Sequence, residues 1–265
     1  MLNLTNVTLV AATSVARAAT LRAMRLSMEQ VRFGAAVFLC DEPPEDGQAT
    51  GIEWRAISPL RSRADYSRFM LHEMADHVAT DFALVVQWDG YVLDSAGWRD
   101  EFLEYDYIGA PWPQFDDGRR VGNGGFSLRS SQLLRVCATL PDRWGEPEDI
   151  SICRTFGHHL ELEHGIRFAP VDIATRFAYE REARRGDEFG FHGVFNLIDQ
   201  LPRKEFTTLI AGLEAGLVGS LECRDVLRKS LARGHWSSAL AAFRLWKSQR
   251  QFGGSDLTKN CQNSN

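Results

Sequence analysis

The sequence predicts an α/β fold, in which a mostly parallel sheet is flanked by helices and followed by a C-terminal helical appendage. Three observations support this prediction. Apolar, β-branched runs alternate with helical patterns over residues 7–86. These runs carry too few polar residues to face water on one side. From Arg203 onward, helical periodicity alone is visible.

The first part of the chain supplies most of the sheet. Residues 7–12, 33–39, 52–57 and 82–86 are predicted strands because they are short, apolar and bounded by polar or turn residues. Residues 15–31 and 66–78 carry apolar side chains at helical spacing. The order strand, helix, strand, strand, helix, strand is typical of a parallel sheet covered by helices.

Beyond residue 89 the pattern becomes irregular. We expect helices near residues 98–103, 131–138 and 150–161, and strands at 126–129 and 177–180. Segments 105–113 and 189–193 combine aromatic residues with Gly or Pro, which predicts turns and loops.

The predicted organisation is a domain over residues 1–202, a helical appendage over 203–248 and a flexible tail over 249–265. The appendage holds three amphipathic patterns, at 206–217, 224–233 and 236–246, and could bind a protein partner. The tail is rich in Gly, Ser and Asn, which is typical of frayed ends.

Composition excludes several classes of protein. The chain has 265 residues, 44% of them hydrophobic and 25% charged, which is ordinary for a soluble domain. A net charge of −5 gives no basic surface for nucleic acid. Five cysteines without a CxxC pair favour a reducing compartment over a disulfide or zinc framework. No signal peptide or membrane span is expected, so the predicted location is the cytoplasm.

Polar side chains follow three of the predicted strands. Thr13 comes after the first strand, Asp41 after the second, and Gln87-Trp88-Asp89 after the strand at 82–86. Ligands of open parallel sheets bind at the carboxyl ends of the strands. These residues therefore form a predicted ligand-binding edge.

Two further motifs are candidates for chemistry. Asn123-Gly124-Gly125 lets a backbone approach a ligand closely, although a glycine-rich hairpin turn explains it equally. Glu148-Asp149 precedes a predicted helix, where acids also interact well with the helix dipole. A carboxylate in a closed site suits a general base, since burial raises its pKa.

Four segments in this order resemble a known family. They are residues 87–89, 102–112, 122–129 and 147–149. Together they resemble bacterial domains, long of unknown function, that are similar to glycosyltransferases of the GT-A fold. The resemblance covers roughly residues 5 to 200. It implies a Rossmann-like sheet and a nucleotide-diphosphate-sugar donor, a UDP-sugar first of all, used in polysaccharide or glycoconjugate assembly.

The resemblance also implies roles for the candidate residues. Asp149 would be the base of an inverting transfer, with Glu148 assisting the acceptor. Asp89 and His192 would hold a divalent cation, Mn²⁺ or Mg²⁺. The donor would contact Thr13, Asp41, Gln87, Asp89, Asn123, Gly124 and Gly125.

The sequence departs from the family pattern at Gln87, where GT-A enzymes commonly carry an acid. Asp94 is an alternative second acid, while Asp89 as a turn residue and His192 as a structural histidine are the plain alternatives. The rival function is a non-catalytic module that binds a nucleotide sugar or carbohydrate. A hydrolase that splits the nucleotide sugar is a third reading.

Overall fold

The computed structural model describes residues 1–45, 47, 49–214 and 217–252. The chain divides into two compact units, Met1–His192 and Gly193–Asn265. Most of the flexible tail predicted over 249–265 lies outside the described residues, as does Cys261.

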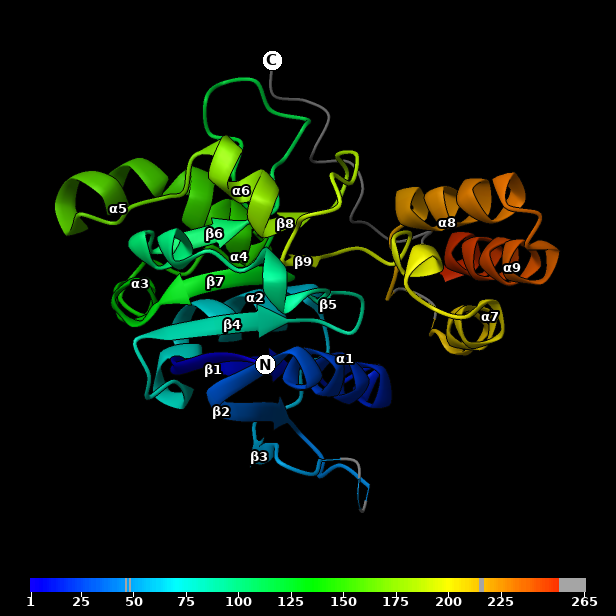
Figure 1. Cartoon of the computed structure of the whole chain (residues 1–265), viewed down its shortest axis with the longest axis horizontal. Coiled ribbons are helices and arrows are strands. Elements are labelled where there is room, and N and C mark those ends of the chain that lie inside the picture. Colours follow the sequence, from blue (N-terminus) through cyan, green and yellow to red (C-terminus); the bar gives the residue numbers. More distant parts are fainter. Residues whose placement is uncertain (46, 48, 215–216, 253–265) are drawn as a thin grey trace. The chain divides into compact units, whose positions relative to one another are not determined.

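Within the described residues, a six-stranded sheet organises the first unit (Figure 1). Its strand order is β3-β2-β1-β4-β7-β6. The pairs β3/β2, β2/β1 and β1/β4 are parallel, while β7 runs antiparallel to both β4 and β6. The predicted α/β class with a mostly parallel sheet is therefore confirmed.

The large sheet uses strands from most of the first unit. They are β1 (Leu2–Ala12), β2 (Val31–Cys40), β3 (Glu53–Ala56), β4 (Phe82–Val86), β6 (Tyr107–Gly109) and β7 (Phe126–Ser130). The helices longer than one turn in this unit are α1 (Arg17–Gln30), α2 (Arg63–His72), α3 (Ser131–Cys137), α5 (Gly157–His164) and α6 (Val171–Phe177). Five short helical turns complete it: η1 (Met74–His77), η2 (Ser95–Gly97), η3 (Asp100–Glu104), α4 (Glu148–Ile150) and η4 (Ser151–Thr155).

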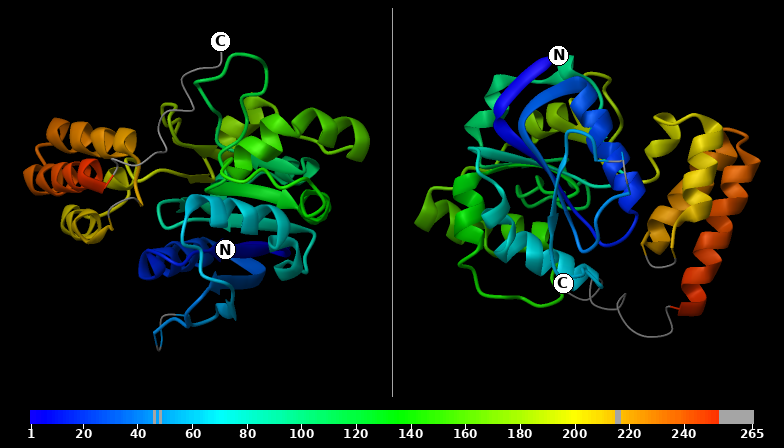
Figure 2. Two further views of the ribbon diagram at one scale, coloured as in Figure 1. Left: turned by 180° about the vertical axis from the view of Figure 1, so that it is seen from behind. Right: turned by 90° about the horizontal axis from the view of Figure 1, so that it is seen from below.

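Alternation along the strands gives the sheet two buried faces. On β1, Leu9 and Ala11 belong to one core cluster, and Val10 and Ala12 belong to another. The first cluster includes side chains of α1 and α6, and the second includes side chains of α2. Helices α1 and α2 accordingly lie on opposite faces of the sheet (Figure 1 and Figure 2). Burial on both faces explains why these strands are almost continuously apolar.

A second, smaller sheet was not predicted. It joins β5 (Tyr91–Val92), β9 (Gly190–Phe191) and β8 (Ala178–Tyr179) in the order β5-β9-β8. β9 pairs antiparallel with β5 and parallel with β8. The expectation of a plain loop at 189–193 was wrong, because a two-residue strand is too short to show a period in the sequence. The same reason applies to β6 in the turn-rich segment 105–113.

The second unit contains a 3-10 turn, η5 (Leu197–Asp199), and the helices α7 (Arg203–Gly212), α8 (Ser220–Ala232) and α9 (Trp236–Phe252). Phe206, Val226 and Ala242, one from each helix, are almost completely buried. A hydrogen bond of 2.7 Å between Thr207 Oγ1 and Ser238 Oγ connects α7 to α9. The three predicted amphipathic helices are therefore present, with boundaries shifted by a few residues.

Across the described residues, every helix is too short or too polar to cross a membrane.

Candidate functional site

Three of the candidate positions follow neighbouring strands of the sheet. Ala12 lies opposite Leu39 of β2, and Val10 lies opposite Val85 of β4. Because these strands are neighbours and parallel, Thr13, Asp41 and Gln87 leave the sheet at one edge. Gln87 then forms a tight turn with Gly90, whose N–H donates to the Gln87 carbonyl at 3.1 Å. Asp89 is buried within this turn.

The small sheet brings three polar side chains together. Register pairs Tyr91 with Phe191 and Tyr179 with Phe191. Asp89 lies two residues before the start of β5, while Glu180 and His192 directly follow β8 and β9. All three therefore meet at the same end of this sheet.

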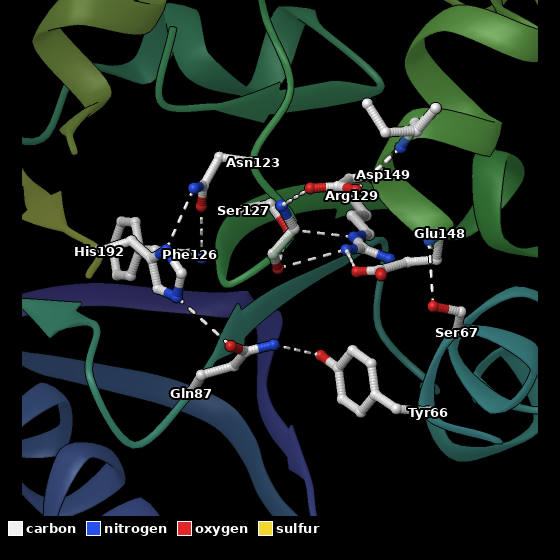
Figure 3. Close-up of polar contacts among 12 residues, drawn as sticks. Tyr66, Ser67, Gln87, Asn123, Phe126, Ser127, Arg129, Glu148, Asp149 and His192 are labelled. Atoms are coloured by element: carbon white, nitrogen blue, oxygen red, sulfur yellow. Dashed lines mark hydrogen bonds and ion pairs between the residues drawn. The ribbon is translucent and has the colours of Figure 1, made fainter. Parts of the chain in front are cut away.

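His192 is the centre of this group, and Figure 3 shows its contacts with Asn123 and Gln87. Its Nε2 lies 3.3 Å from Asp89 Oδ1 and 3.3 Å from Gln87 Oε1. Its Nδ1 lies 3.4 Å from Glu180 Oε1 and 3.1 Å from Asn123 Nδ2. Both ring nitrogens thus face polar partners, and the imidazole is fixed in one orientation.

The charges around His192 shift its pKa. Burial alone would lower the pKa of His192, but the carboxylates of Asp89 and Glu180 outweigh burial and raise it well above its usual value. For Glu180, burial opposes ionisation, yet His192 lowers the pKa of the carboxyl overall. The two carboxylates therefore favour the protonated form of His192.

Gln87 connects this group to α2. Its Nε2 donates to Tyr66 Oη at 2.8 Å, while its Oε1 faces His192. The amide thus bridges a helix and the histidine. A carboxylate in its place would accept from the tyrosine but would add a third negative charge around His192.

The glycine-rich turn joins the histidine group to a second group of charged side chains. Asn123 has a left-handed backbone with a φ of 57°, a conformation that asparagine tolerates better than most residues. Its side chain faces His192, and the next residue, Gly124, donates its N–H to Asp149 Oδ2 at 3.1 Å. Consecutive residues therefore contact both groups.

Close packing explains the two glycines. A Cβ on Gly124 would overlap Glu148 Oε1, and a Cβ on Gly125 would overlap the ring of His192. Any side chain at either position would displace a charged group. The sequence signal at 124 and 125 therefore reflects contact with charged side chains on both sides of the turn.

Arg129 holds the second group together. It is fully buried on β7, with Nη2 3.2 Å from Glu148 Oε1 and 3.3 Å from the Gly124 carbonyl. Its Nε donates to Ser127 Oγ at 3.0 Å, and its guanidinium lies 5.5 Å from the centre of the Tyr107 ring. Within the described part of the chain, its Nη1 has no hydrogen-bond partner.

Glu148 and Asp149 lie in two different environments. Glu148 is 5% exposed, pairs with Arg129, and donates its backbone N–H to Ser67 Oγ at 3.2 Å. Asp149 is half-buried and accepts from the N–H of Gly124 and, at 2.8 Å, of Ile150. Burial and the neighbouring Glu148 charge raise the pKa of Asp149 to about 7, against the hydrogen bonds and Arg129. Asp149 is therefore poised to exchange a proton near neutral pH.

The remaining candidates have local partners. Thr13 is buried, and its hydroxyl donates to the Val15 carbonyl. Burial opposes ionisation of Asp41, but Ser14, Cys40 and Arg17 lower its pKa overall. Asp94 is exposed and accepts from Ala96 N–H at 2.8 Å, so it caps a turn rather than joining the group around His192.

Sequence analysis did not single out Arg129, Glu180 or Tyr66. Its position in the sequence could have pointed to Glu180. It ends the predicted strand 177–180, and other candidate residues also follow predicted strands. Arg129 ends the strand-like run after the glycines, but no local feature distinguishes a buried arginine from an exposed one.

The residues present fit a divalent cation in part. Asp89 Oδ1 is buried, and among the described residues its contact with His192 Nε2 at 3.3 Å does not have hydrogen-bond geometry, so the oxygen could bind a cation in its place. Asp89, His192 and the Gln87 amide oxygen are donors that suit Mn²⁺ or Mg²⁺. No three His, Cys, Asp or Glu side chains are arranged as a metal site in the described chain, so a cation here would also need oxygens from a ligand.

A family model described as "Protein of unknown function (DUF5672)" matches residues 52–192, and the chain belongs to this family. The matched region contains every candidate residue except Thr13 and Asp41. None of the curated proteins matches the chain.

Two solved structures are similar to the chain at low sequence identity and low TM-score. One is galactosyltransferase LgtC with donor and acceptor sugar analogues, at 13% identity over 83% of this chain and 99% of that chain, with a TM-score of 0.44. The other is mannosyltransferase PcManGT from Pyrobaculum calidifontis with GDP-Man and Mn²⁺, at 11% identity over 95% of this chain and 76% of that chain, with a TM-score of 0.43.

Replacing Arg129 tests the buried ion pair. Arg129→Met leaves the Glu148 charge buried and unpaired, so we expect the free energy of unfolding to fall by about 3–5 kcal/mol. Adding Glu148→Gln should recover part of this loss. Arg68→Met, which removes half-exposed ion pairs with Glu73 and Asp142, should cost less than about 1 kcal/mol. Equal losses in the Arg129 single variant and the double variant would contradict the assignment.

Asp149 makes stability depend on pH. Its pKa is higher in the folded chain, about 7, than in an unfolded chain, about 4. The folded state therefore loses stability as pH rises through this range, because ionisation is more costly in the fold. Between pH 5 and pH 8, the free energy of unfolding of Asp149→Asn should rise by about 2.5 kcal/mol relative to that of the wild type. Denaturant unfolding at the two pH values measures this difference, and a constant difference would place the Asp149 pKa near its ordinary value.

Proposed function

We propose that the chain is a glycosyltransferase that moves a sugar from a nucleotide-diphosphate-sugar donor to a hydroxyl of a glycan or glycoconjugate. The observation that carries the proposal is the turn at Asn123 and Gly124. One residue of this turn contacts His192, and the next contacts Asp149. The group around His192, which with a divalent cation would suit a diphosphate, and a carboxylate suited to a base thus lie on either side of one short backbone segment.

In this proposal the donor lies along the ligand-binding edge. Thr13 and Asp41, at the ends of β1 and β2, would contact the nucleoside. The diphosphate would lie near Asp89 and His192, and the sugar would lie over Asn123, Gly124 and Gly125. A UDP-sugar is the first donor to test, and we expect the transferred group to be a hexosyl or pentosyl group.

The acceptor hydroxyl would be activated by Asp149. The acceptor oxygen forms a bond to the anomeric carbon while the bond from that carbon to the diphosphate breaks, and the hydroxyl proton passes to the Asp149 carboxylate. A single base of this kind suits direct transfer with inversion. Glu148 is already paired with Arg129, so its role in this proposal is to fix the position of Asp149 beside Gly124.

A divalent cation would be held by Asp89 and His192, with Gln87 beside them. When bound, Mn²⁺ or Mg²⁺ would neutralise the charge of the leaving diphosphate. Phosphate oxygens and water would complete its coordination, because Mg²⁺ uses few protein ligands in such sites.

A non-catalytic module that binds a nucleotide sugar is the second candidate. It is favoured by Gln87, which provides an amide where an acid would give the cation a second anionic ligand beside Asp89. The two candidates share the donor site and differ at Asp149, which has no task in a module that only binds.

Donor binding is tested by thermal shift. Nucleotide diphosphates and their sugars, screened with and without Mn²⁺, should raise the melting temperature of the chain for one nucleotide, because a ligand of the folded state stabilises it by mass action. Asp89→Asn should abolish the Mn²⁺-dependent part of the shift. His158→Ala, at an exposed position, is the matched control. Absence of any shift at millimolar ligand would overturn the donor site.

Turnover separates the two candidates. Asp149→Asn should retain donor binding and lose transfer or donor hydrolysis by about 10²- to 10⁴-fold, as expected for removal of a general base. Wild-type turnover should rise with pH around an inflection near the Asp149 pKa of about 7. The control Asp142→Asn changes a half-exposed acid of the preceding loop and should leave turnover intact. Equal turnover in wild type and Asp149→Asn would contradict the role of Asp149, and zero turnover in both would favour the binding module.

A further inference from the structure

Helix α9 carries an exposed apolar face. Trp236, Leu240 and Phe243 are 68%, 49% and 44% exposed. Their spacing of four and three residues places them on one side of the helix. The buried side of the helix holds Ala239, Ala242 and Leu245, which are at most 8% exposed. Large apolar side chains thus occupy the outward side, where a helix of a soluble bundle normally carries polar residues.

Basic residues continue this face. Lys247 is exposed and lies four residues beyond Phe243, on the same side of the helix, and Arg244 is exposed beside it. The sequence of α9 contains three basic residues and no acidic one. We call Trp236, Leu240, Phe243 and Lys247 the α9 face.

The second unit as a whole is positively charged, like α9. Residues 193–265 contain ten Lys or Arg and six Asp or Glu, which gives a net charge of +4. Residues 1–192 contain twenty Lys or Arg and twenty-nine Asp or Glu, which gives a net charge of −9. The unit that carries the apolar face is therefore cationic within an acidic chain.

We propose that the α9 face binds an anionic membrane surface without crossing it. Trp and Phe beside Leu, flanked by Lys and Arg and without acids, are the residues that lie at the boundary of headgroups and acyl chains. Lys247 and Arg244 match anionic headgroups, and each basic residue near such a surface adds to the attraction. A second copy of this chain fits less well, because pairing two α9 faces would bring basic side chains together.

This inference is independent of the proposed function, because it concerns only α9 and makes no use of Asp149 or His192. If both hold, the membrane surface would bring the chain to acceptors that are attached to lipid.

Vesicle co-sedimentation of the full chain tests the proposal. Binding to phosphatidylcholine vesicles that contain phosphatidylglycerol should be at least about tenfold stronger than binding to pure phosphatidylcholine, and it should weaken in about 0.5 M salt. Trp236→Ser and Phe243→Ser should each weaken binding about tenfold, because each removes a large apolar side chain from the contact. Leu221→Ser, at a residue of α8 that is 66% exposed and outside the α9 face, is the matched control.

Lys247→Glu provides a second variant that leaves the apolar residues in place. It should reduce binding to the anionic vesicles and leave binding to pure phosphatidylcholine unchanged. Melting curves of all variants verify that they are folded. Three results would overturn the proposal: no binding of the folded wild-type chain to anionic vesicles at low salt, equal binding by the Trp236→Ser/Phe243→Ser double variant, or a dimer that depends on Trp236 without any lipid binding.

Discussion

The ion pair between Arg129 and Glu148 is the constraint on which the arrangement of the site depends. Arg129 lies on β7, the strand between β4 and β6, and its side chain has no exposed surface. A buried charge of this kind is tolerated only when it is paired. Glu148 supplies the opposite charge, and the Gly124 carbonyl accepts a further hydrogen bond. Gly124 has no room for a side chain because Glu148 occupies that space. The pair therefore fixes the glycine turn and the start of α4 relative to each other.

Asp149 owes its environment to this pair. It follows Glu148 directly and is held by the Gly124 N–H, so its position depends on the same turn. The Glu148 charge helps to raise the pKa of Asp149, and Arg129 opposes that effect. Glu148 thus serves the ion pair with Arg129, while the neighbouring Asp149 has a pKa near neutrality. Two adjacent carboxylates in different environments commonly have different roles in acid–base chemistry.

The sequence predicted the large sheet well because its strands are buried on both faces and are therefore apolar throughout. It also pointed to Asp89, Asn123, Asp149 and His192, which the structure connects through the glycine turn, since turns, strand ends and paired glycines are visible in a single chain. It could not predict the small sheet, whose two-residue strands have no readable period, and so it did not anticipate that Glu180 lies against His192. The roles of Arg129 and Glu148 were also hidden, because burial of a charge depends on contacts between distant residues. The catalytic and metal-binding roles stay predictions.

The most direct test of the central claim is a crystal structure of the chain with a nucleotide diphosphate and Mn²⁺. We predict that the diphosphate lies against Asp89 and His192, with its terminal phosphate directed toward the Asn123–Gly124 turn and the Asp149 carboxylate on the far side of that turn. The Arg129–Glu148 pair should be unchanged. A nucleotide bound away from this turn, or a ligand that contacts Glu148 while Asp149 points elsewhere, would contradict the account.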